Sequence, residues 1–239
     1  MPASVQAFAR TRSKGSQPLP EAETRPALLV MAKAPVPGRV KTRLTPPCSA
    51  RQAAELAAAA LADTLKAAAG SRLAARRVLV LDWRPGSWIP AGFEIVPQRG
   101  RGLAERLAAA FDDARAPAFL VGMDTPQLTP ELLDAGLAAL EDGDAALGPA
   151  LDGGYWGIGL RHTHSDAFRG VPMGAQDTAA AQRERLAELE LRTASLPLLR
   201  DVDTIEDARA VAAEAPASRF ATTLTGLALA LSRTSQPAT

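Results

Sequence analysis

Residues 30–44 read VMAKAPVPGRVKTRL, and this stretch decides how the rest of the chain is interpreted. The apolar run over 27–31 is typical of a buried strand, and it leads directly into a loop with two prolines, a glycine and four cations. The prolines fix φ and remove two backbone donors, while Gly38 can adopt backbone angles that other residues avoid. Lys33 and Lys41 are two of only four lysines in the chain, and a compact ammonium group suits phosphate oxygens. The sequence therefore predicts a phosphate-binding loop, the alternative being a solvated turn between a strand and a helix.

Length and composition predict one α/β domain. The chain has 239 residues, of which 47% are hydrophobic, so it can bury a full core. A formal net charge of +1 argues against nucleic acid as a partner and leaves the positive charge to act locally, through the loop. The single Cys48 excludes an intrachain disulfide, and we expect a cytoplasmic protein. Since no apolar run approaches the about 20 residues that cross a bilayer, we expect no membrane association.

The two ends of the sequence differ from its centre. Residues 1–25 mix Pro, Ser, Gly and Arg with little apolar content, and they lack the continuous apolar segment of a secretory signal. We expect a disordered tail there and a second one over 232–239. The folded domain is then predicted over 26–231.

Predicted strands and helices alternate along this domain. Strands are expected over 27–31, 77–81, 93–96, 118–122, 144–148, 155–160 and 191–196. Helices are expected over 49–69, 103–114, 129–141, 176–190 and 204–213. Such alternation implies parallel pairing through right-handed crossovers, with helices on both faces of the sheet. The prediction is a single three-layer Rossmann-like α/β domain with a mostly parallel central sheet.

Acidic residues follow two of the predicted strands, where ligands bind in open α/β sheets. Asp124 comes directly after the strand over 118–122, and a carboxylate at a strand tip is a ligand for Mg²⁺ or Mn²⁺. Capping is a weaker interpretation of Asp124, because Thr129 already caps the next helix. Asp203 is either a second metal ligand or part of a capping box over 203–206, and Asp201 could serve as the ligand in its place.

Two glycine-containing segments are further candidates. Residues 152–155 combine flexible backbone with an aromatic ring at a strand mouth, which suits either a small acceptor or an ordinary hairpin turn. Residues 98–103 open a helix whose free N–H groups could bind an anion or a base edge. No Gly-x-Ser-x-Gly elbow is present, so the sequence offers no Ser/His/Asp arrangement.

Four segments together resemble one family: 32–44, 122–126, 147–155 and 201–204. The family is a bacterial branch of the GT-A-like nucleotide-diphospho-sugar transferases, commonly labelled a glycosyltransferase or radical-SAM-associated transferase, and its neighbours include 2-phospholactate guanylyltransferase and molybdenum-cofactor guanylyltransferase. The resemblance covers about residues 27–212. It implies a GT-A-type sandwich, nucleotide phosphates on the loop and a metal on Asp124, with Asp203 as a further candidate ligand.

From the residues and the resemblance together we expect four sets of site residues. The catalytic set is Lys33, Lys41, Arg43 and Asp124. The nucleotide-binding set is Ala32, Lys33, Gly38, Arg39, Lys41, Arg43, Gln98 and Gly102. The acceptor-binding set is Asp152, Gly153, Gly154 and Tyr155, and the metal ligands are Asp124 and Asp203, holding Mg²⁺ or Mn²⁺.

The charge of the loop favours one chemistry among three. A triphosphate carries more localised negative charge than a diphospho-sugar, and four cations suit pyrophosphate as the leaving group. We therefore expect nucleotidyl transfer from a nucleoside triphosphate to a small phosphorylated acceptor. Glycosyl transfer from a nucleotide-diphospho-sugar and a non-catalytic nucleotide-binding regulatory module are the alternatives, because this fold serves several functions. The sequence identifies neither the nucleobase of the donor nor the acceptor. A homodimer is compatible with it.

Overall fold

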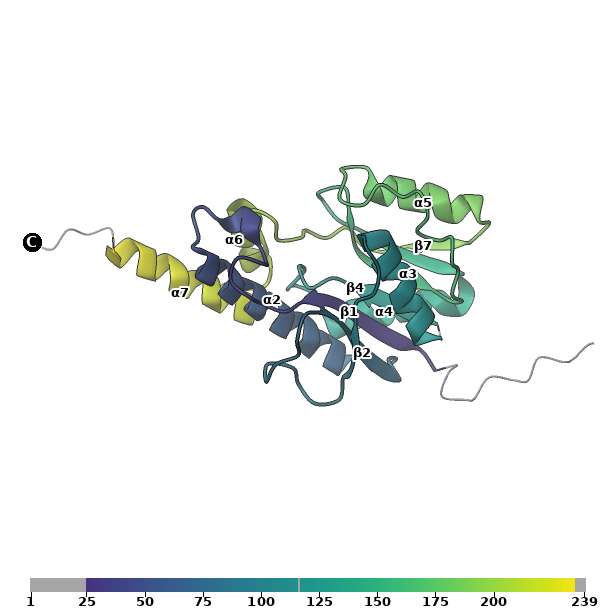
Figure 1. Cartoon of the computed structure of the whole chain (residues 1–239), viewed down its shortest axis with the longest axis horizontal. Coiled ribbons are helices and arrows are strands. Elements are labelled where there is room, and N and C mark those ends of the chain that lie inside the picture. The colour runs from purple at the N-terminus through teal and green to yellow at the C-terminus, as the bar shows by residue number, and fades with distance from the viewer. Residues whose placement is uncertain (1–24, 116, 235–239) are drawn as a thin grey trace, which may run out of the picture.

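The computed structural model describes residues 25–115 and 117–234, which form a three-layer sandwich with a sheet in the middle (Figure 1). The strands are β1 (Ala27–Lys33), β2 (Arg76–Asp82), β3 (Glu94–Pro97), β4 (Ala118–Val121), β5 (Ala145–Pro149), β6 (Tyr155–Leu160) and β7 (Thr193–Ser195). Their order is β3-β2-β1-β4-β6-β5-β7. All neighbours are parallel except β6, which runs antiparallel to β4 and β5. The predicted mostly parallel sheet is confirmed.

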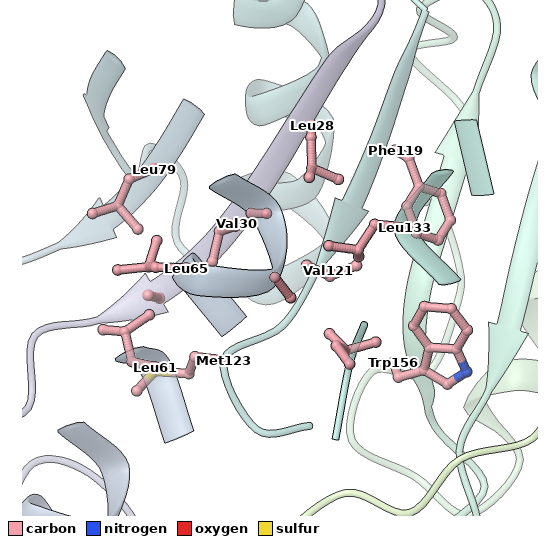
Figure 2. Close-up of a cluster of buried hydrophobic side chains, with 14 of the residues drawn as sticks. Leu28, Val30, Leu61, Leu65, Leu79, Phe119, Val121, Met123, Leu133 and Trp156 are labelled. Atoms are coloured by element: carbon pink, nitrogen blue, oxygen red, sulfur yellow. The ribbon is translucent and has the colours of Figure 1, made fainter. Parts of the chain in front are cut away.

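Two helices cover each face of the sheet. The helices are α2 (Ala50–Gly70), α3 (Leu103–Ala114), α4 (Pro130–Asp142), α5 (Thr178–Glu188), α6 (Ile205–Glu214) and α7 (Arg219–Thr234), with the short 3-10 helix η1 (Thr42–Leu44) after β1. Alternate β1 residues serve opposite faces, as the period of two in a strand requires. Leu28 and Val30 pack in a cluster with α2 and α4, which Figure 2 shows, whereas Leu29 and Met31 pack with α3 and α5.

The alanine-rich helix α2 is buried on two sides. Leu61 and Leu65 face the sheet, while Leu56 and Ala60 belong to a separate cluster with η1, α6 and α7. Small side chains let other helices approach closely on both sides, so the composition of α2 reflects its central place in the packing. The N-terminus of α2 has the predicted Ser49 cap, completed by Gln52 into a capping box.

The C-terminal helix α7 was not predicted. It packs against α2 and α6, with Phe220 almost fully buried, and lies at one end of the molecule beside α2 (Figure 1). The predicted tail over 232–239 is wrong at its start, because α7 continues to Thr234. The remainder of that tail and residues 1–24 of the predicted N-terminal tail lie outside the described residues. No helix in the described part of the chain is long and apolar enough to cross a membrane.

Candidate functional site

A cavity of about 650 Å³ opens at the carboxyl ends of β1 and β4. These strands are neighbours, and the chain builds the sheet outward from β1 in one direction before continuing through β4 in the other. Such a switch point is where open α/β sheets bind ligands. Of the residues predicted from the sequence, the lining includes Ala32, Lys33, Arg39, Lys41, Arg43, Gln98, Gly102, Asp124, Tyr155 and Asp203. It does not include Gly38, Asp152, Gly153 or Gly154.

The centre of the cavity wall is a cluster of two cations and two carboxylates, Lys41, Arg43, Asp124 and Asp203. The Lys41 Nζ lies 2.8 Å from Asp124 Oδ1 and 3.6 Å from Asp203 Oδ1. It also donates a hydrogen bond to the carbonyl of Val202. The other oxygen of Asp203, Oδ2, lies 2.7 Å from Arg43 Nη1. The lysine side chain is only 8% exposed, whereas that of Arg43 is 74% exposed. The two carboxylates therefore converge on a buried ammonium group.

The loop after β1 contains two residues with left-handed backbone conformations before η1. Gly38 has φ +78°, and Lys41 itself has φ +47°, a left-handed conformation that is uncommon outside glycine. Val40 and Leu44 are buried on either side of Lys41 and anchor the loop to the core. Gly38 thus contributes to the site by turning the chain, without lining the cavity.

A backbone hydrogen bond brings the two acidic segments together. The Val202 N–H donates to the Asp124 carbonyl at 3.0 Å, which places Asp203 beside the end of β4. The capping box predicted over 203–206 is shifted by one residue, because Thr204 is the N-cap of α6 and Asp207 completes the box. The carboxylate of Asp203 is therefore not used for capping and is available to Lys41 and Arg43.

Asp201 lies deeper in the same wall. Its Oδ1 accepts a 2.7 Å hydrogen bond from Thr125 Oγ1. Burial is the main cause that raises the pKa of Asp201 to about 6, and the carboxylates of Asp124 and Asp152 raise it further. Because Asp201 is buried and bonded to Thr125, we interpret it as a residue that fixes the acidic segment in place and not as a metal ligand.

The donor set fits a hard divalent cation that is shared with a substrate. Mg²⁺ is commonly held by one or two carboxylates, with waters and substrate phosphates completing its shell. Asp124 and Asp203 are 42% and 33% exposed and approach one common point. Over residues 25–115 and 117–234 no group of three or more His, Cys, Asp or Glu side chains could hold a metal ion. A pair of carboxylates suits Mg²⁺ or Mn²⁺ brought with phosphates better than a permanent metal cage.

A second group of cations surrounds the cavity without carboxylate partners. Within the described part of the chain, neither Lys33 nor Arg101 makes a side-chain ion pair, and Arg39 lies 4.0 Å over the ring of Trp83. The N-terminus of α3 joins this group, since its N-cap Gly102 has no side chain to cap the helix. Positive charge and free N–H groups together provide an environment for anionic groups. Arg101 was not among the predicted site residues, although it lies in the candidate segment 98–103, two residues before the predicted helix.

Gln98 lines the cavity, but its amide group is occupied. Its Nε2 donates to the carbonyls of Ala32 and Val80, at 2.9 and 3.1 Å, and its Oε1 accepts from Arg106. Arg106 in turn pairs with Asp82. Gln98 therefore ties the ends of β1 and β2 together, which makes it a positioning residue in this arrangement.

The segment over 152–155 is a hairpin turn between β5 and β6. Asp152 Oδ1 accepts from the Gly154 N–H, and the Gly153 carbonyl accepts from Ala179 N–H at the start of α5. Only Tyr155 of the predicted acceptor set reaches the cavity lining. Its hydroxyl lies 3.4 Å from Gln182 Oε1, and burial raises the pKa of the phenol above its usual range.

We expect Gly153→Ala to destabilise the fold much more than Gly174→Ala. Both glycines have positive φ, +89° and +78°, but a Cβ on Gly153 would lie 1.7 Å from the Gln176 carbonyl oxygen, whereas one on Gly174 would meet nothing within 4 Å. The control should lose about 1–2 kcal/mol for the left-handed conformation. Gly153→Ala should lower the free energy of unfolding by about 2–5 kcal/mol, because the clash of the new Cβ with Gln176 adds to the cost of the left-handed conformation. Urea unfolding measures both, and equal losses would show that the contact with Gln176 is not restrictive.

Comparison with known proteins agrees with this architecture. The profile of the family described as "Uncharacterized protein conserved in bacteria (DUF2064)" matches residues 51–175. The crystal structure of a proposed nucleotide-diphospho-sugar transferase from Desulfovibrio desulfuricans G20 shares 32% identity, with a TM-score of 0.69 over 77% of this chain and 84% of that one. Among curated proteins there is no match.

Two more distant structures share the fold. CMP:2-keto-3-deoxy-manno-octonic acid synthetase complexed with CTP has 13% identity and a TM-score of 0.54, over 80% of this chain and 99% of that one. A nucleotidyl transferase from Methanothermobacter thermautotroptrophicus has 14% identity and a TM-score of 0.52, over 78% of this chain and 95% of that one. The resemblance predicted from the sequence is thus confirmed, and the chain belongs to the DUF2064 family, with the GT-A-like fold of nucleotide-diphospho-sugar transferases and nucleotidyltransferases.

Proposed function

We propose that this protein is a divalent-cation-dependent nucleotidyltransferase. It would bind a nucleoside triphosphate in the cavity and transfer the nucleoside monophosphate to the phosphate of a small acceptor. The observation that carries this proposal is the meeting of the acidic pair Asp124 and Asp203 with the cationic loop at the switch point of the sheet. This arrangement offers both a cation position and phosphate contacts within one cavity.

The distribution of charge supports a triphosphate as the donor. Lys41 and Arg43 are paired with the two carboxylates, so that cluster is close to neutral. Lys33 and Arg101 then leave an excess of positive charge at the cavity wall. A donor with several adjacent phosphate charges satisfies these groups better than a neutral or singly charged ligand.

In the proposed reaction, an oxygen of the acceptor phosphate attacks the α-phosphorus, a new P–O bond forms, and the bond to the β-phosphate oxygen breaks as pyrophosphate leaves. The chain contributes Lys33, Lys41 and Arg101 to hold the β- and γ-phosphates and to stabilise the departing charge. Asp124 and Asp203 would hold the divalent cation, which supplies charge neutralisation at the phosphates when bound. No protein nucleophile is needed, which agrees with the absence of a Gly-x-Ser-x-Gly elbow from the sequence.

Glycosyl transfer is the second candidate. The related Desulfovibrio protein is described as a proposed nucleotide-diphospho-sugar transferase, and at 32% identity it is a meaningful relative. In this alternative the same cation position would hold the diphosphate, and the acceptor would lie toward Tyr155. The two chemistries share the nucleotide site and differ in the bond that breaks.

Product analysis separates the candidates. The protein is incubated with Mg²⁺ and each nucleoside triphosphate or common nucleotide-diphospho-sugar, together with a set of small phosphorylated and hydroxylated acceptors, and products are followed by phosphorus NMR and mass spectrometry. Pyrophosphate together with a nucleotidylated acceptor supports our proposal. Free nucleoside diphosphate with a glycosylated acceptor supports the alternative, and nucleotide binding without turnover would indicate a regulatory module.

A further inference from the structure

The cation position between Asp124 and Asp203 is filled by a side chain of the protein itself. We propose that Lys41 acts as an exchangeable internal cation, which holds the two carboxylates together in the free protein and moves onto the nucleotide phosphates when a metal–nucleotide complex enters. The proposal rests on the function proposed above and adds a statement about ligand binding. The metal and the nucleotide bind together, and the metal alone binds weakly.

The contacts of the ammonium group are those of a bound cation. The ammonium group donates a hydrogen bond to the Val202 carbonyl and forms ion pairs with the carboxylates of Asp124 and Asp203. The side chain is 8% exposed, so solvent contributes little to its hydration. A divalent cation bound to Asp124 Oδ1 and Asp203 Oδ1 would take the same position, because these two oxygens lie 2.8 and 3.6 Å from the ammonium nitrogen.

Arg43 makes the exchange feasible for Asp203. Its guanidinium holds Oδ2, whereas Lys41 uses Oδ1. When the lysine leaves, Asp203 therefore keeps its orientation and presents Oδ1 to an incoming cation. Arg43 is mostly exposed and acts from the rim, so it does not compete for the central position.

Charge balance explains why neither ligand suffices alone. If Lys41 moves without replacement, the partly buried Asp124 loses its cation and Asp203 keeps only the exposed Arg43, which is unfavourable. A metal ion alone must displace the ammonium, and that ammonium then has no anionic partner. A metal–nucleotide complex offers a cation to the carboxylates and phosphate oxygens to the lysine in one step. Binding of the two ligands is therefore positively coupled.

Electron paramagnetic resonance of free Mn²⁺ tests this directly, without any need for turnover. In the absence of nucleotide, the wild-type protein should bind Mn²⁺ weakly, and Lys41→Met should bind it about tenfold or more tightly, within the usual range of coupling between sites. Lys33→Met is the matched control, because it removes one positive charge from the same cavity wall but not from the carboxylates. Its Mn²⁺ affinity should rise by no more than about threefold, since the charge acts from a greater distance.

Equal Mn²⁺ affinities of Lys41→Met and Lys33→Met would overturn the proposal, and so would no Mn²⁺ binding to either. The wild-type protein provides a second measurement that does not depend on the variant folding: a non-hydrolysable triphosphate analogue should tighten Mn²⁺ binding, and an unchanged affinity contradicts the coupling. These results are distinguishable from a failure of the proposed reaction. Glycosyl transfer in the product assay would reject nucleotidyl transfer and leave the Mn²⁺ prediction intact.

Discussion

Asp124→Asn is expected to lower metal-dependent turnover by about a hundredfold or more, the range seen when one transition-state-stabilising group is removed. The amide keeps the size of the carboxylate but loses the charge that a hard cation requires. Asp124 is also the closer of the two carboxylates to Lys41, so the variant removes one oxygen contact of the cation position. Turnover at saturating Mg²⁺ and thermal unfolding should be measured together.

A suitable control is Asp113→Asn. Asp113 is a partly exposed carboxylate on α3 that pairs with Arg99 and does not line the cavity. The control should retain normal turnover. If Asp124→Asn keeps near-normal activity with an unchanged unfolding curve, Asp124 does not hold a catalytic metal.

Lys41→Met should weaken the binding of a nucleoside triphosphate by roughly tenfold to a hundredfold. Loss of a charge-assisted hydrogen bond in a partly desolvated site costs about 1.5–3 kcal/mol. The loss should be larger for the triphosphate than for the monophosphate of the same base, because Lys41 is assigned to the outer phosphates. The loss of affinity caused by Lys41→Met should also be larger in EDTA than in saturating Mg²⁺. Without metal, the carboxylates of the variant have neither the ammonium nor a divalent cation beside them, and they repel the phosphates.

Isothermal titration calorimetry with the two nucleotides measures this difference. Lys66→Met is the control, because Lys66 is exposed on α2 and does not line the cavity. It should bind both nucleotides as the wild type does. Equal losses for triphosphate and monophosphate in Lys41→Met would show that Lys41 serves the base, the acceptor or the fold, and would remove the main reason for preferring nucleotidyl transfer.

The sequence predicted those parts of the fold that depend on local pattern. Strong apolar runs such as 118–122 and a capping residue such as Ser49 specify their elements with little help from distant contacts. Helix α7 was missed although Phe220, Leu224 and Leu227 follow a helical spacing. Packing of Phe220 and its neighbours on the outer side of α2 stabilises it, and such tertiary contacts are not visible in one sequence.

The candidate site was predictable to a similar extent. The loop after β1 and Asp124 were found because ligand-binding residues follow strands in this class of fold. The sequence could not decide whether Asp203 caps a helix, because a shift of one residue separates a capping aspartate from a free one. The hydrogen bonds of Thr204 and Asp207 show that these two residues form the capping box. Gly153 was predicted to bind an acceptor, whereas it lies outside the cavity lining, and a Cβ added there would lie 1.7 Å from the Gln176 carbonyl oxygen.

The most direct test of the central claim is a crystal structure with Mn²⁺ and a non-hydrolysable nucleoside triphosphate, using the anomalous signal of manganese to locate the metal. We expect one manganese peak between Asp124 and Asp203, the β- and γ-phosphates against Lys33 and Arg101, and the Lys41 ammonium moved from the carboxylates to a phosphate oxygen. A triphosphate bound outside the cavity, or a manganese peak away from both carboxylates, would contradict the account.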